Sequence, residues 1–332
     1  MSTTDQQQSV QNVCWVITEG TIGMENQALG LAERLSLPIV IKRVRLKKPW
    51  RWLAPWSLGS PFGCLAVGAD PISPPWPRLA IGCGRQSIPF MRAIRQASAH
   101  RTITVQTQNP RVGPENFDLV IPPEHDRLTG PNVLPILGSP NRISKTRLDA
   151  ARAQFSTLFE PLKSPRVAVL VGGASNAYRF GTEDARGLAE ALRALAKDHG
   201  LIVMVSRRTG AANTEILKQF LANTDAFVWN GEGENPYLGA LAWADAFVVT
   251  ADSTNMISEA AATGRPIHIA ALSGGSAKFR AFHAALMQNG IARPFSGKLE
   301  DWTYKPLDET GRAAAKIQAL LDVRRLATDI SR

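Results

Sequence analysis

A glycine-rich loop near the middle of the chain has residues suited to binding phosphate. The apolar run Val167–Val171 predicts a buried strand, and it ends in Gly172 and Gly173, followed by Ser175 and Asn176. Glycines let backbone N–H groups approach a ligand closely, and hydroxyl and amide side chains add further donors. A tight turn without a ligand would contain the same residues. The loop is neither a Walker motif nor GxGxxG, so it does not identify a nucleotide site by itself.

Two arginines follow the next predicted strand, 201–205. Arg207 and Arg208 come directly after Ser206. Guanidinium groups at the end of a strand can pair with phosphate or carboxylate. The alternative is a pair of solvated surface charges.

The segment from 235 to 266 has the most features of a binding site. Asp252 or Ser253 can cap a helix, and the N-terminus of a helix favours anions. Glu259 lies further along that helix and could accept hydrogen bonds from two ribose hydroxyls. The alternative is that Ser253 is only a cap and Glu259 is only solvated. The candidate contacts of a nucleotide ligand in these loops are Gly172, Gly173, Ser175, Asn176, Ser206, Arg207, Arg208, Asn235, Tyr237, Asp252, Ser253, Met256 and Glu259.

The first half of the chain has a second set of polar loop residues. Glu19 lies in a turn with Gly20 and Gly23, between a predicted strand and a predicted helix. A carboxylate in such a loop can take a proton from the hydroxyl group of an acceptor substrate, and Glu19 is our candidate for this catalytic role. Amides at loop ends are also common as plain turn formers. The residues expected to contact the acceptor are Thr18, Gly20, Gly23, Asn26, Gln108 and Asn109.

A basic and aromatic segment is expected to contact a membrane. The net charge is +10, and residues 1–163 hold 19 of the 38 basic but only 11 of the 28 acidic side chains. Basic residues with interfacial tryptophans suit an anionic membrane surface. Nucleic acid binding is the less favoured alternative, and a basic loop that packs its tryptophans against its own domain is another. The expected membrane contacts are Lys47, Lys48, Trp50, Arg51, Trp52 and Trp56.

Apolar runs that alternate with amphipathic stretches position these residues. The 332-residue chain is 44% hydrophobic and 20% charged, which is typical of a globular protein of about two domains. Strand–helix alternation predicts an α/β fold with two doubly wound, Rossmann-like domains that face a cleft. We expect an N-terminal domain over 1–160, a nucleotide-sugar domain over 165–308, and a C-terminal helix over 309–332 that could pack back on the first domain.

Several functional classes are not indicated. The three cysteines, Cys14, Cys64 and Cys83, cannot all pair and none is in a CxxC, so no disulfide framework or zinc site is expected. The five histidines have no metal-ligand spacing, and we expect neither a metal nor a cofactor beyond the donor substrate. Because no signal peptide or spanning segment is evident, we expect a cytoplasmic protein that could be peripheral at the inner face of the membrane. The sequence does not indicate the oligomeric state.

Two segments resemble the GT-B glycosyltransferases, especially the lipid-linked N-acetylglucosaminyltransferases of cell-wall synthesis. Residues 169–175, Val-Leu-Val-Gly-Gly-Ala-Ser, are similar to the Gly-Gly-Ser loop of the family's donor domain. Residues 242–250 and 253–266 are similar to its donor-nucleotide segment. The resemblance implies that Ser253 and Glu259 face the nucleotide sugar, with the glutamate on the ribose. The family usually has Arg-Ser-Gly where this chain has Ala251, Asp252 and Ser253, which affects the expected diphosphate contact.

A second resemblance covers nearly the whole chain. Residues 16–32, 106–111 and 235–245 are similar to the mitochondrial-fission "elongated mitochondria" family. Plant members of that family are described as adaptors that recruit a dynamin-type GTPase, and it has many bacterial members of unsettled role. The family usually has Thr-Asp-Gly where this chain has Thr18, Glu19 and Gly20.

These observations together favour a metal-independent glycosyltransferase. It would transfer sugar from a nucleotide-diphosphate sugar, held by the contacts from Gly172 to Glu259 named above, to a cell-envelope or lipid-linked acceptor, with Glu19 as the base. A nucleotide-sugar epimerase would share the nucleotide contacts but would need acid and base residues on both faces of the sugar. A non-enzymatic membrane adaptor would keep the fold and bind no nucleotide.

Overall fold

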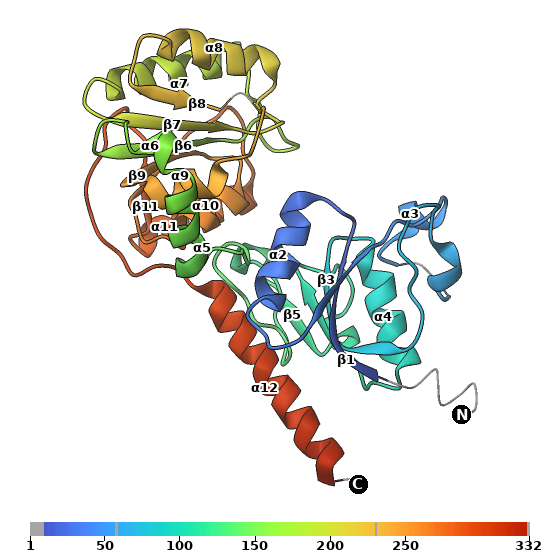
Figure 1. Ribbon diagram of the computed structural model, residues 1–332. Coiled ribbons are helices and arrows are strands. Elements are labelled where there is room, and N and C mark those ends of the chain that lie inside the picture. The colour runs from blue at the N-terminus through green and yellow to red at the C-terminus, as the bar shows by residue number, and fades with distance from the viewer. Residues whose placement is uncertain (1–9, 57–58, 230, 331–332) are drawn as a thin grey trace. The chain divides into compact units, whose positions relative to one another are not determined.

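The computed structural model describes residues 10–56, 59–229 and 231–330. The chain forms two compact units, and the second is inserted into the first. Unit 1 contains Met1–Arg142 together with Asp308–Arg332, and unit 2 contains Ile143–Leu307. Each unit has its own parallel β-sheet, as the sequence predicted (Figure 1).

Unit 1 has a five-stranded parallel sheet in the order β2-β1-β3-β4-β5. Its strands are β1 (Val10–Thr18), β2 (Ile39–Arg43), β3 (Trp76–Cys83), β4 (Ile103–Thr107) and β5 (Leu119–Ile121). Its α-helices are α2 (Ile22–Ala32), α3 (Trp50–Leu53), α4 (Ser87–Ala97) and α12 (Glu309–Ile330), with short 3-10 turns at Phe62–Cys64, Pro114–Asn116 and Glu124–Asp126.

Side chains of β1 contribute alternately to two hydrophobic clusters, one on each face of this sheet. Cys14 and Val16 pack into a cluster with α2 and α12, whereas Trp15 and Ile17 pack into a second cluster with α4. Successive side chains of a strand point to opposite faces, so a strand that is apolar at every position is typical of a sheet covered on both sides. Figure 1 shows α2 and α4 on opposite sides of the sheet.

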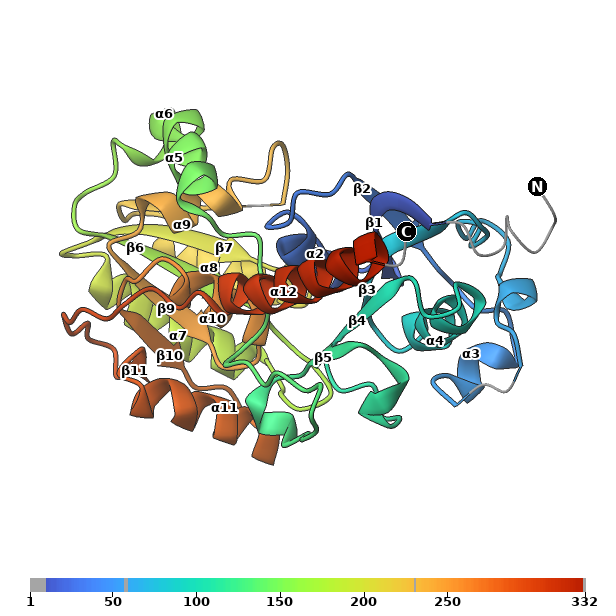
Figure 2. The same ribbon diagram turned by 90° about the horizontal axis from the view of Figure 1, so that it is seen from below.

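The C-terminal helix α12 completes the core of unit 1. Ala313, Ala314, Ile317 and Leu321 are buried at helical spacing, and α12 contacts α2. Figure 2 shows this long helix from below. The expectation that the C-terminal helix packs back on the first domain is therefore confirmed.

Unit 2 has a six-stranded parallel sheet in the order β11-β10-β9-β6-β7-β8. Its strands are β6 (Arg166–Val171), β7 (Gly200–Val205), β8 (Ala226–Val228), β9 (Ala246–Thr250), β10 (Ile267–Ala270) and β11 (Ala292–Pro294). Its helices are α5 (Lys145–Gln154), α6 (Ser156–Phe159), α7 (Thr182–Leu195), α8 (Ala211–Leu221), α9 (Tyr237–Trp243), α10 (Thr254–Ala261) and α11 (Ala277–Gln288).

The strand order reverses at one point in each sheet. In unit 1, β2 and β3 lie on opposite sides of β1. In unit 2, β7 and β9 lie on opposite sides of β6. The loops that leave the carboxyl ends of two such adjacent strands diverge to opposite faces, and ligands of open α/β sheets bind in the crevice there. Most of the residues singled out from the sequence lie in these loops.

The units divide the chain at positions that differ from the predicted boundaries. Residues 143–160, which were expected in the first domain, belong to unit 2 because α5 packs on α9. The indole Nε1 of Trp243 donates to the carbonyl oxygen of Arg152 at 2.9 Å, and the Arg152 guanidinium lies 4.1 Å from the ring centroid. These contacts join residues that are distant in sequence.

Among the described residues, no helix is both long and apolar enough to cross a bilayer.

Candidate functional site

The switch point of unit 2 brings together the loops after β6 and β9. The backbone N–H of Gly172 donates to Thr250 Oγ1 at 2.8 Å, and that of Gly173 donates to Asp252 Oδ2 at 3.0 Å. The sequence predicted that these amides would be free for phosphate. The structure corrects this expectation, because both donors are bonded to side chains of the β9–α10 loop.

Close packing of three loops requires glycine at both positions. A Cβ atom at Gly172 would lie 2.3 Å from Asp252 Oδ2, and one at Gly173 would lie 2.1 Å from the carbonyl oxygen of Arg208. Gly173 also has a φ of +146°, a backbone conformation that other residues rarely adopt. The glycines therefore allow the loops after β6, β7 and β9 to meet.

Asp252 is the charged centre of this arrangement. Its side chain is completely buried, and its Oδ2 lies 2.7 Å from Nη1 of Arg208. The hydroxyl of Thr250 donates to its Oδ1 at 2.7 Å. Nearby, the pKa of Tyr178 is raised, first by burial and then by the negative charge of Asp252. The sequence predicted that Asp252 and Arg208 both contact a ligand, whereas the structure pairs them with each other.

The loop after β7 is bonded to the glycine loop. The Ser206 hydroxyl donates to the carbonyl oxygen of Gly172 at 2.5 Å, and the Thr209 hydroxyl donates to the same oxygen at 2.7 Å. Thr209 is buried and was not singled out from the sequence. Arg207 is exposed and has no ion pair among the residues that the structure describes.

The end of the glycine loop forms a turn. Ser175 Oγ accepts from the backbone N–H groups of Ala177 and Tyr178 at 3.3 and 3.1 Å, and Asn176 is exposed. Helix α7 begins only at Thr182, so no helix N-terminus lies directly behind the glycines. The helix that does begin at this switch point is α10, where Ser253 Oγ accepts from the N–H of Met256 at 3.4 Å and thereby forms the expected cap.

Glu259 lies on α10 beside Tyr237, the first residue of α9. The Tyr237 hydroxyl donates to Glu259 Oε2 at 2.5 Å. Burial raises the pKa of Glu259 to about 7, although the hydrogen bond from Tyr237 opposes this shift. The pKa of Tyr237 is also raised, by burial and by the charge of Glu259. Glu259 is therefore a half-buried carboxyl group with a hydroxyl partner, and the solvated alternative is wrong.

Asn235 positions this tyrosine. Its Oδ1 accepts from the backbone N–H of Tyr237 at 3.0 Å, which fixes the chain as it enters α9. The sequence placed Asn235, Tyr237 and Glu259 in one binding segment, and α9 and α10 do bring the last two together. Nucleotide binding by these residues remains a prediction.

The switch point of unit 1 has a similar bridge. Both oxygens of Glu19 accept from Gln86, Oε1 from its backbone N–H at 2.9 Å and Oε2 from its side-chain amide at 2.6 Å. Gln86 Oε1 in turn accepts from the N–H of Leu46 at 2.9 Å. Gln86 was not singled out from the sequence, because its only local signal is its place before α4. Glu19 and Gln86 together thus connect the loops after β1, β2 and β3.

The other predicted acceptor residues lie at the end of β1, on α2 and in the loop after β4. The Gln108 amide donates to Gln27 Oε1 at 3.0 Å. Asn109 Oδ1 accepts from the N–H of Arg111 at 2.9 Å, and Thr18 Oγ1 accepts from the N–H of Gly20 at 3.2 Å. Gly23 and Asn26 lie on α2. Most of these side chains shape turns, and acceptor binding by them remains a prediction.

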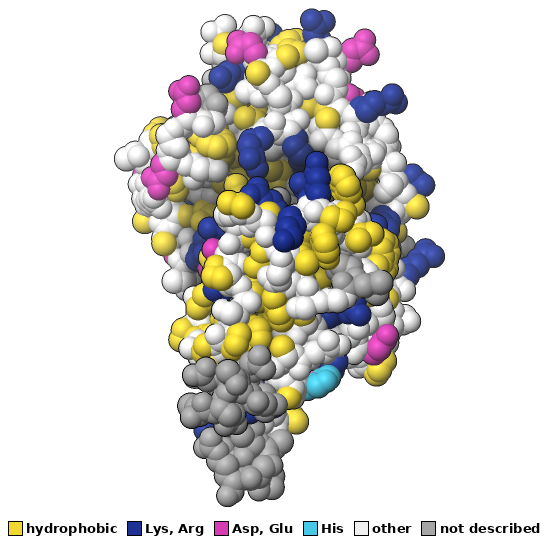
Figure 3. Space-filling view, turned by 90° about the vertical axis from the view of Figure 1, so that its right-hand side faces the viewer, with side chains coloured by type: hydrophobic (Ala, Val, Ile, Leu, Met, Phe, Trp, Pro, Cys, Tyr) yellow, Lys and Arg dark blue, Asp and Glu magenta, His cyan; other side chains and the backbone are white. Residues whose placement is uncertain are grey.

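The basic and aromatic segment forms an exposed projection. Trp52 and Trp56 are 64% and 61% exposed, whereas Trp50 packs against the α4 side of the core. The Lys48 ammonium lies 5.3 Å from the centroid of the Trp52 ring. Figure 3 faces the α3 side of unit 1 and shows Lys and Arg side chains gathered beside hydrophobic ones. Only one of the three tryptophans follows the self-packing alternative.

Hydrogen bonds hold this projection in place. Arg85 donates to the carbonyl oxygens of Arg51 and Ala54 at 3.1 and 3.2 Å. The indole N–H of Trp56 donates to the carbonyl oxygen of Arg111 at 3.2 Å. The four-residue helix α3 is therefore attached to the loops at the carboxyl edge of the unit 1 sheet.

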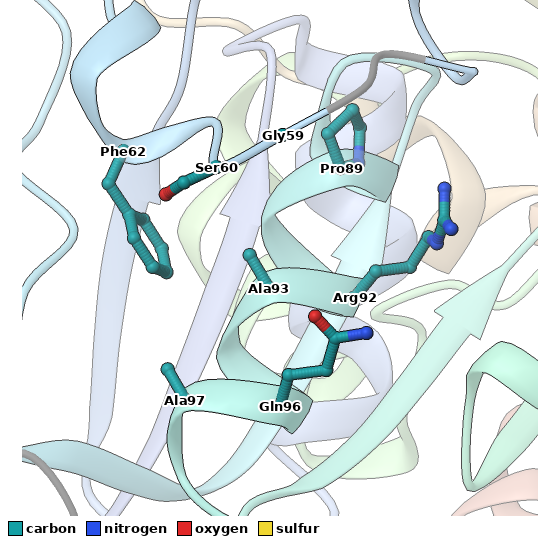
Figure 4. Close-up of a pocket in the computed structure, with 8 residues that line it drawn as sticks. All are labelled: Gly59, Ser60, Phe62, Pro89, Arg92, Ala93, Gln96 and Ala97. Carbon is teal, nitrogen blue, oxygen red and sulfur yellow. The ribbon is translucent and has the colours of Figure 1, made fainter.

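A pocket of about 650 Å³ adjoins this segment. It lies between the outward face of α4, with Pro89, Arg92 and Gln96, and the stretch from Gly59 to Phe62 (Figure 4). Arg92 is held by Asn116, whose Oδ1 accepts from its Nε at 3.1 Å. None of the residues predicted to bind donor or acceptor lines this pocket. In the described part of the chain, no three side chains form a group that could hold a metal ion.

Comparison with known proteins shows the family. The model named "Mitochondrial fission ELM1" matches residues 22–321. The chain belongs to the mitochondrial fission ELM1 family. The "Mitochondrial fission protein ELM1" of Arabidopsis thaliana is 32% identical over 276 residues, which is 75% of this chain and 65% of that protein. The chain therefore spans under two thirds of the length of this relative.

Solved structures place the family member among GT-B-like folds. The UDP-GlcNAc 2-epimerase of Methanocaldococcus jannaschii has a TM-score of 0.56 at 10% identity, with 94% of this chain and 100% of that chain covered. A co-structure of S. aureus MnaA with UDP has a TM-score of 0.50 at 11% identity, with 92% and 87% covered. At these identities the likeness shows the fold alone, which agrees with the predicted pair of doubly wound domains.

Proposed function

We propose that this member of the ELM1 family is a glycosyltransferase that binds a nucleotide sugar in unit 2. The observation that carries the proposal is the Tyr237–Glu259 pair at the carboxyl edge of the sheet. Burial raises the pKa of the Glu259 carboxyl group to about 7, so further hydroxyl groups that donate to it would stabilise its ionised form. A ribose supplies two adjacent hydroxyl donors of this kind.

The N-terminus of α10 supports phosphate binding beside this pair. Ser253 caps α10, and the helix dipole favours a negative charge at that end. Exposed Arg207 supplies a cation for the leaving group. The donor expected from the sequence is a nucleotide-diphosphate sugar, but the engaged amides of Gly172 and Gly173 leave its second phosphate without the partners first assigned to it.

The transfer step balances without a metal. The bond between the anomeric carbon and the phosphate oxygen breaks, and its electron pair leaves with the nucleotide. The acceptor hydroxyl oxygen forms the new bond, and its proton goes to a base. Glu19 remains our candidate base, and the hydroxyl must then share a carboxylate that already accepts from Gln86.

An acceptor at a membrane surface fits the projection around α3. Exposed Trp52 and Trp56 together with Lys48 suit an interface with anionic lipid. The acceptor would then be lipid-linked or part of the cell envelope, and the protein would act peripherally.

A panel of nucleotides tests the proposal. Purified protein is heated with millimolar UDP, GDP, ADP or CMP, and one of them should raise the melting temperature. Glu259→Gln should remove most of this shift, whereas Glu190→Gln, at an exposed position of α7, should keep it. Transfer is then tested as release of free nucleotide from a sugar donor with an envelope lipid extract. No shift with any nucleotide would contradict the proposal.

A non-enzymatic adaptor is the second candidate. The internal bonding of Asp252 with Gly173 and of Glu19 with Gln86 favours it, because in both units groups expected to meet substrate are engaged within the protein. This candidate predicts no nucleotide shift but retained binding to membranes. An epimerase would convert the donor sugar without releasing nucleotide, so the same assay separates it from the transferase.

A further inference from the structure

Asp252 occupies a set of donors that would otherwise suit a phosphate. The Gly173 N–H, the Arg208 guanidinium and the Thr250 hydroxyl all point to its two oxygens, at 3.0, 2.7 and 2.7 Å. A backbone amide in a glycine loop, an arginine and a hydroxyl are the groups that proteins use to hold phosphate oxygens. We call these three donors the Asp252 cradle.

We propose that Asp252 is an internal anion that determines donor specificity, so that the site accepts a nucleoside monophosphate sugar and excludes a second phosphate from the cradle. This inference rests on the proposed function in unit 2. It makes Asp252 a specificity residue, and it corrects the diphosphate that the glycine loop alone would favour.

The packing around the cradle supports exclusion. The Asp252 side chain is 0% exposed, and both its oxygens lie within 2.4 Å of the place that a Cβ on Gly172 would take. The carboxylate therefore fills the space against the glycine loop. A phosphate that bound the same donors would have to displace the Asp252 carboxylate, which is also negatively charged, from its ion pair with Arg208.

The remaining groups suffice for one phosphate. The N-terminus of α10, beginning at Thr254, favours a single anion next to a nucleoside held by Glu259. Arg207 precedes Arg208 and, unlike it, makes no ion pair among the described residues. The two arginines that looked equivalent in sequence thus have different roles.

The cradle can be probed without any nucleotide. Inorganic pyrophosphate should leave the melting temperature of the wild-type protein unchanged. Asp252→Asn removes the internal anion and leaves the partly exposed Arg208 guanidinium without its ion pair, so pyrophosphate should pair with Arg208 and stabilise this variant. The matched control is Asp225→Asn, which also removes a carboxylate that accepts a backbone N–H, that of Lys163, and it should respond as the wild type does. Equal stabilisation of wild type and Asp252→Asn, or of neither, would overturn the inference.

Specificity is then measured with the nucleoside that the nucleotide panel identifies. Calorimetry should give dissociation constants for its monophosphate and diphosphate that agree within about threefold for the wild type. Asp252→Asn should prefer the diphosphate by about tenfold or more, since the Arg208 guanidinium loses its internal anion and can pair with the second phosphate. Asp252→Asn combined with Arg208→Gln should lose that preference. A wild type that already prefers the diphosphate by about tenfold would refute the inference.

Two safeguards keep the outcomes separate. Asp252→Ser is a smaller replacement to use if Asp252→Asn does not fold, and the wild-type ratio needs no variant at all. If no nucleotide binds, the proposed function fails, whereas the pyrophosphate experiment still reports on the cradle by itself.

Discussion

Glu19 and Asp252 have the same structural task in the two units. Each is a carboxylate at a switch point, and each accepts a backbone N–H from the loop after the neighbouring strand, that of Gln86 or Gly173. At a switch point the loops after two adjacent strands leave to opposite faces of the sheet, so some of their backbone N–H groups have no partner on a strand. A side chain that bridges the loops satisfies the donors and sets the spacing of the site.

Glu19→Ala should destabilise unit 1 more than an exposed ion pair can. The change leaves the backbone and amide donors of Gln86 without their acceptor, at a cost of about 1–3 kcal/mol. Glu25→Ala is the control, because it breaks an ion pair with Arg43, whose side chain is 58% exposed, and such pairs contribute at most about 1 kcal/mol. Urea unfolding measures both variants. Equal losses would show that the Glu19 bridge is not structural.

Glu259 should make both stability and nucleotide affinity depend on pH. Its pKa rises from 4.5 to about 7 on folding, so between these values the folded protein holds a proton that the unfolded chain has released. The free energy of unfolding should therefore fall as pH rises from 4.5 to 7, by at most about 3 kcal/mol. Glu259→Gln should lack this slope.

Binding should show the opposite trend. Ribose hydroxyls favour the ionised carboxylate, so nucleotide affinity should increase up to about pH 7 and then level off. Calorimetry in two buffers of different ionisation enthalpy should also detect a proton released on binding. Affinity that is flat between pH 5 and pH 8 would separate Glu259 from the ribose.

At the scale of elements, local signals decided what could be predicted. Ser253 caps an amphipathic stretch, so α10 was expected, and the apolar run before Gly172 predicted β6. The three-residue strand β11, Ala292–Pro294, has no apolar run of its own and was not predicted. The partners of Asp252 and Glu19 could not be predicted, because they lie in loops that only strand order brings near.

The projection around α3 should determine membrane binding. Trp52→Ala together with Trp56→Ala removes two exposed aromatic side chains and should reduce sedimentation with anionic vesicles about tenfold or more. The residual binding should weaken further in high salt, since Lys47 and Lys48 remain. Leu158→Ala is the control, an exposed apolar residue on α6 of unit 2. Unchanged sedimentation of the double variant would exclude this surface.

At the scale of the whole molecule, the chain has two hydrophobic cores because unit 2 is inserted between the two segments of unit 1. The strand–helix alternation predicted two parallel sheets, and both are present. The boundaries were displaced, because α5 has few apolar positions and belongs with unit 2 through contacts with α9, such as the hydrogen bond from Trp243 to Arg152. Unit 1 is discontinuous in sequence, since it needs 308–332 to close its core.

This discontinuity predicts that damage to the C-terminal helix affects only unit 1. Ile317 is completely buried in the cluster that contains α2 and β1, so Ile317→Ala should cost about 2–5 kcal/mol. Leu326→Ala, at a position that is 62% exposed, is the matched control and should cost about 0.5 kcal/mol or less. In thermal unfolding, Ile317→Ala should lower the transition of unit 1 and leave a second transition, identified by its response to nucleotide, in place. If nucleotide still shifts an unchanged second transition, unit 2 folds and binds independently of the α12 core. A single transition lowered as a whole would instead mean that the two cores unfold as one cooperative system.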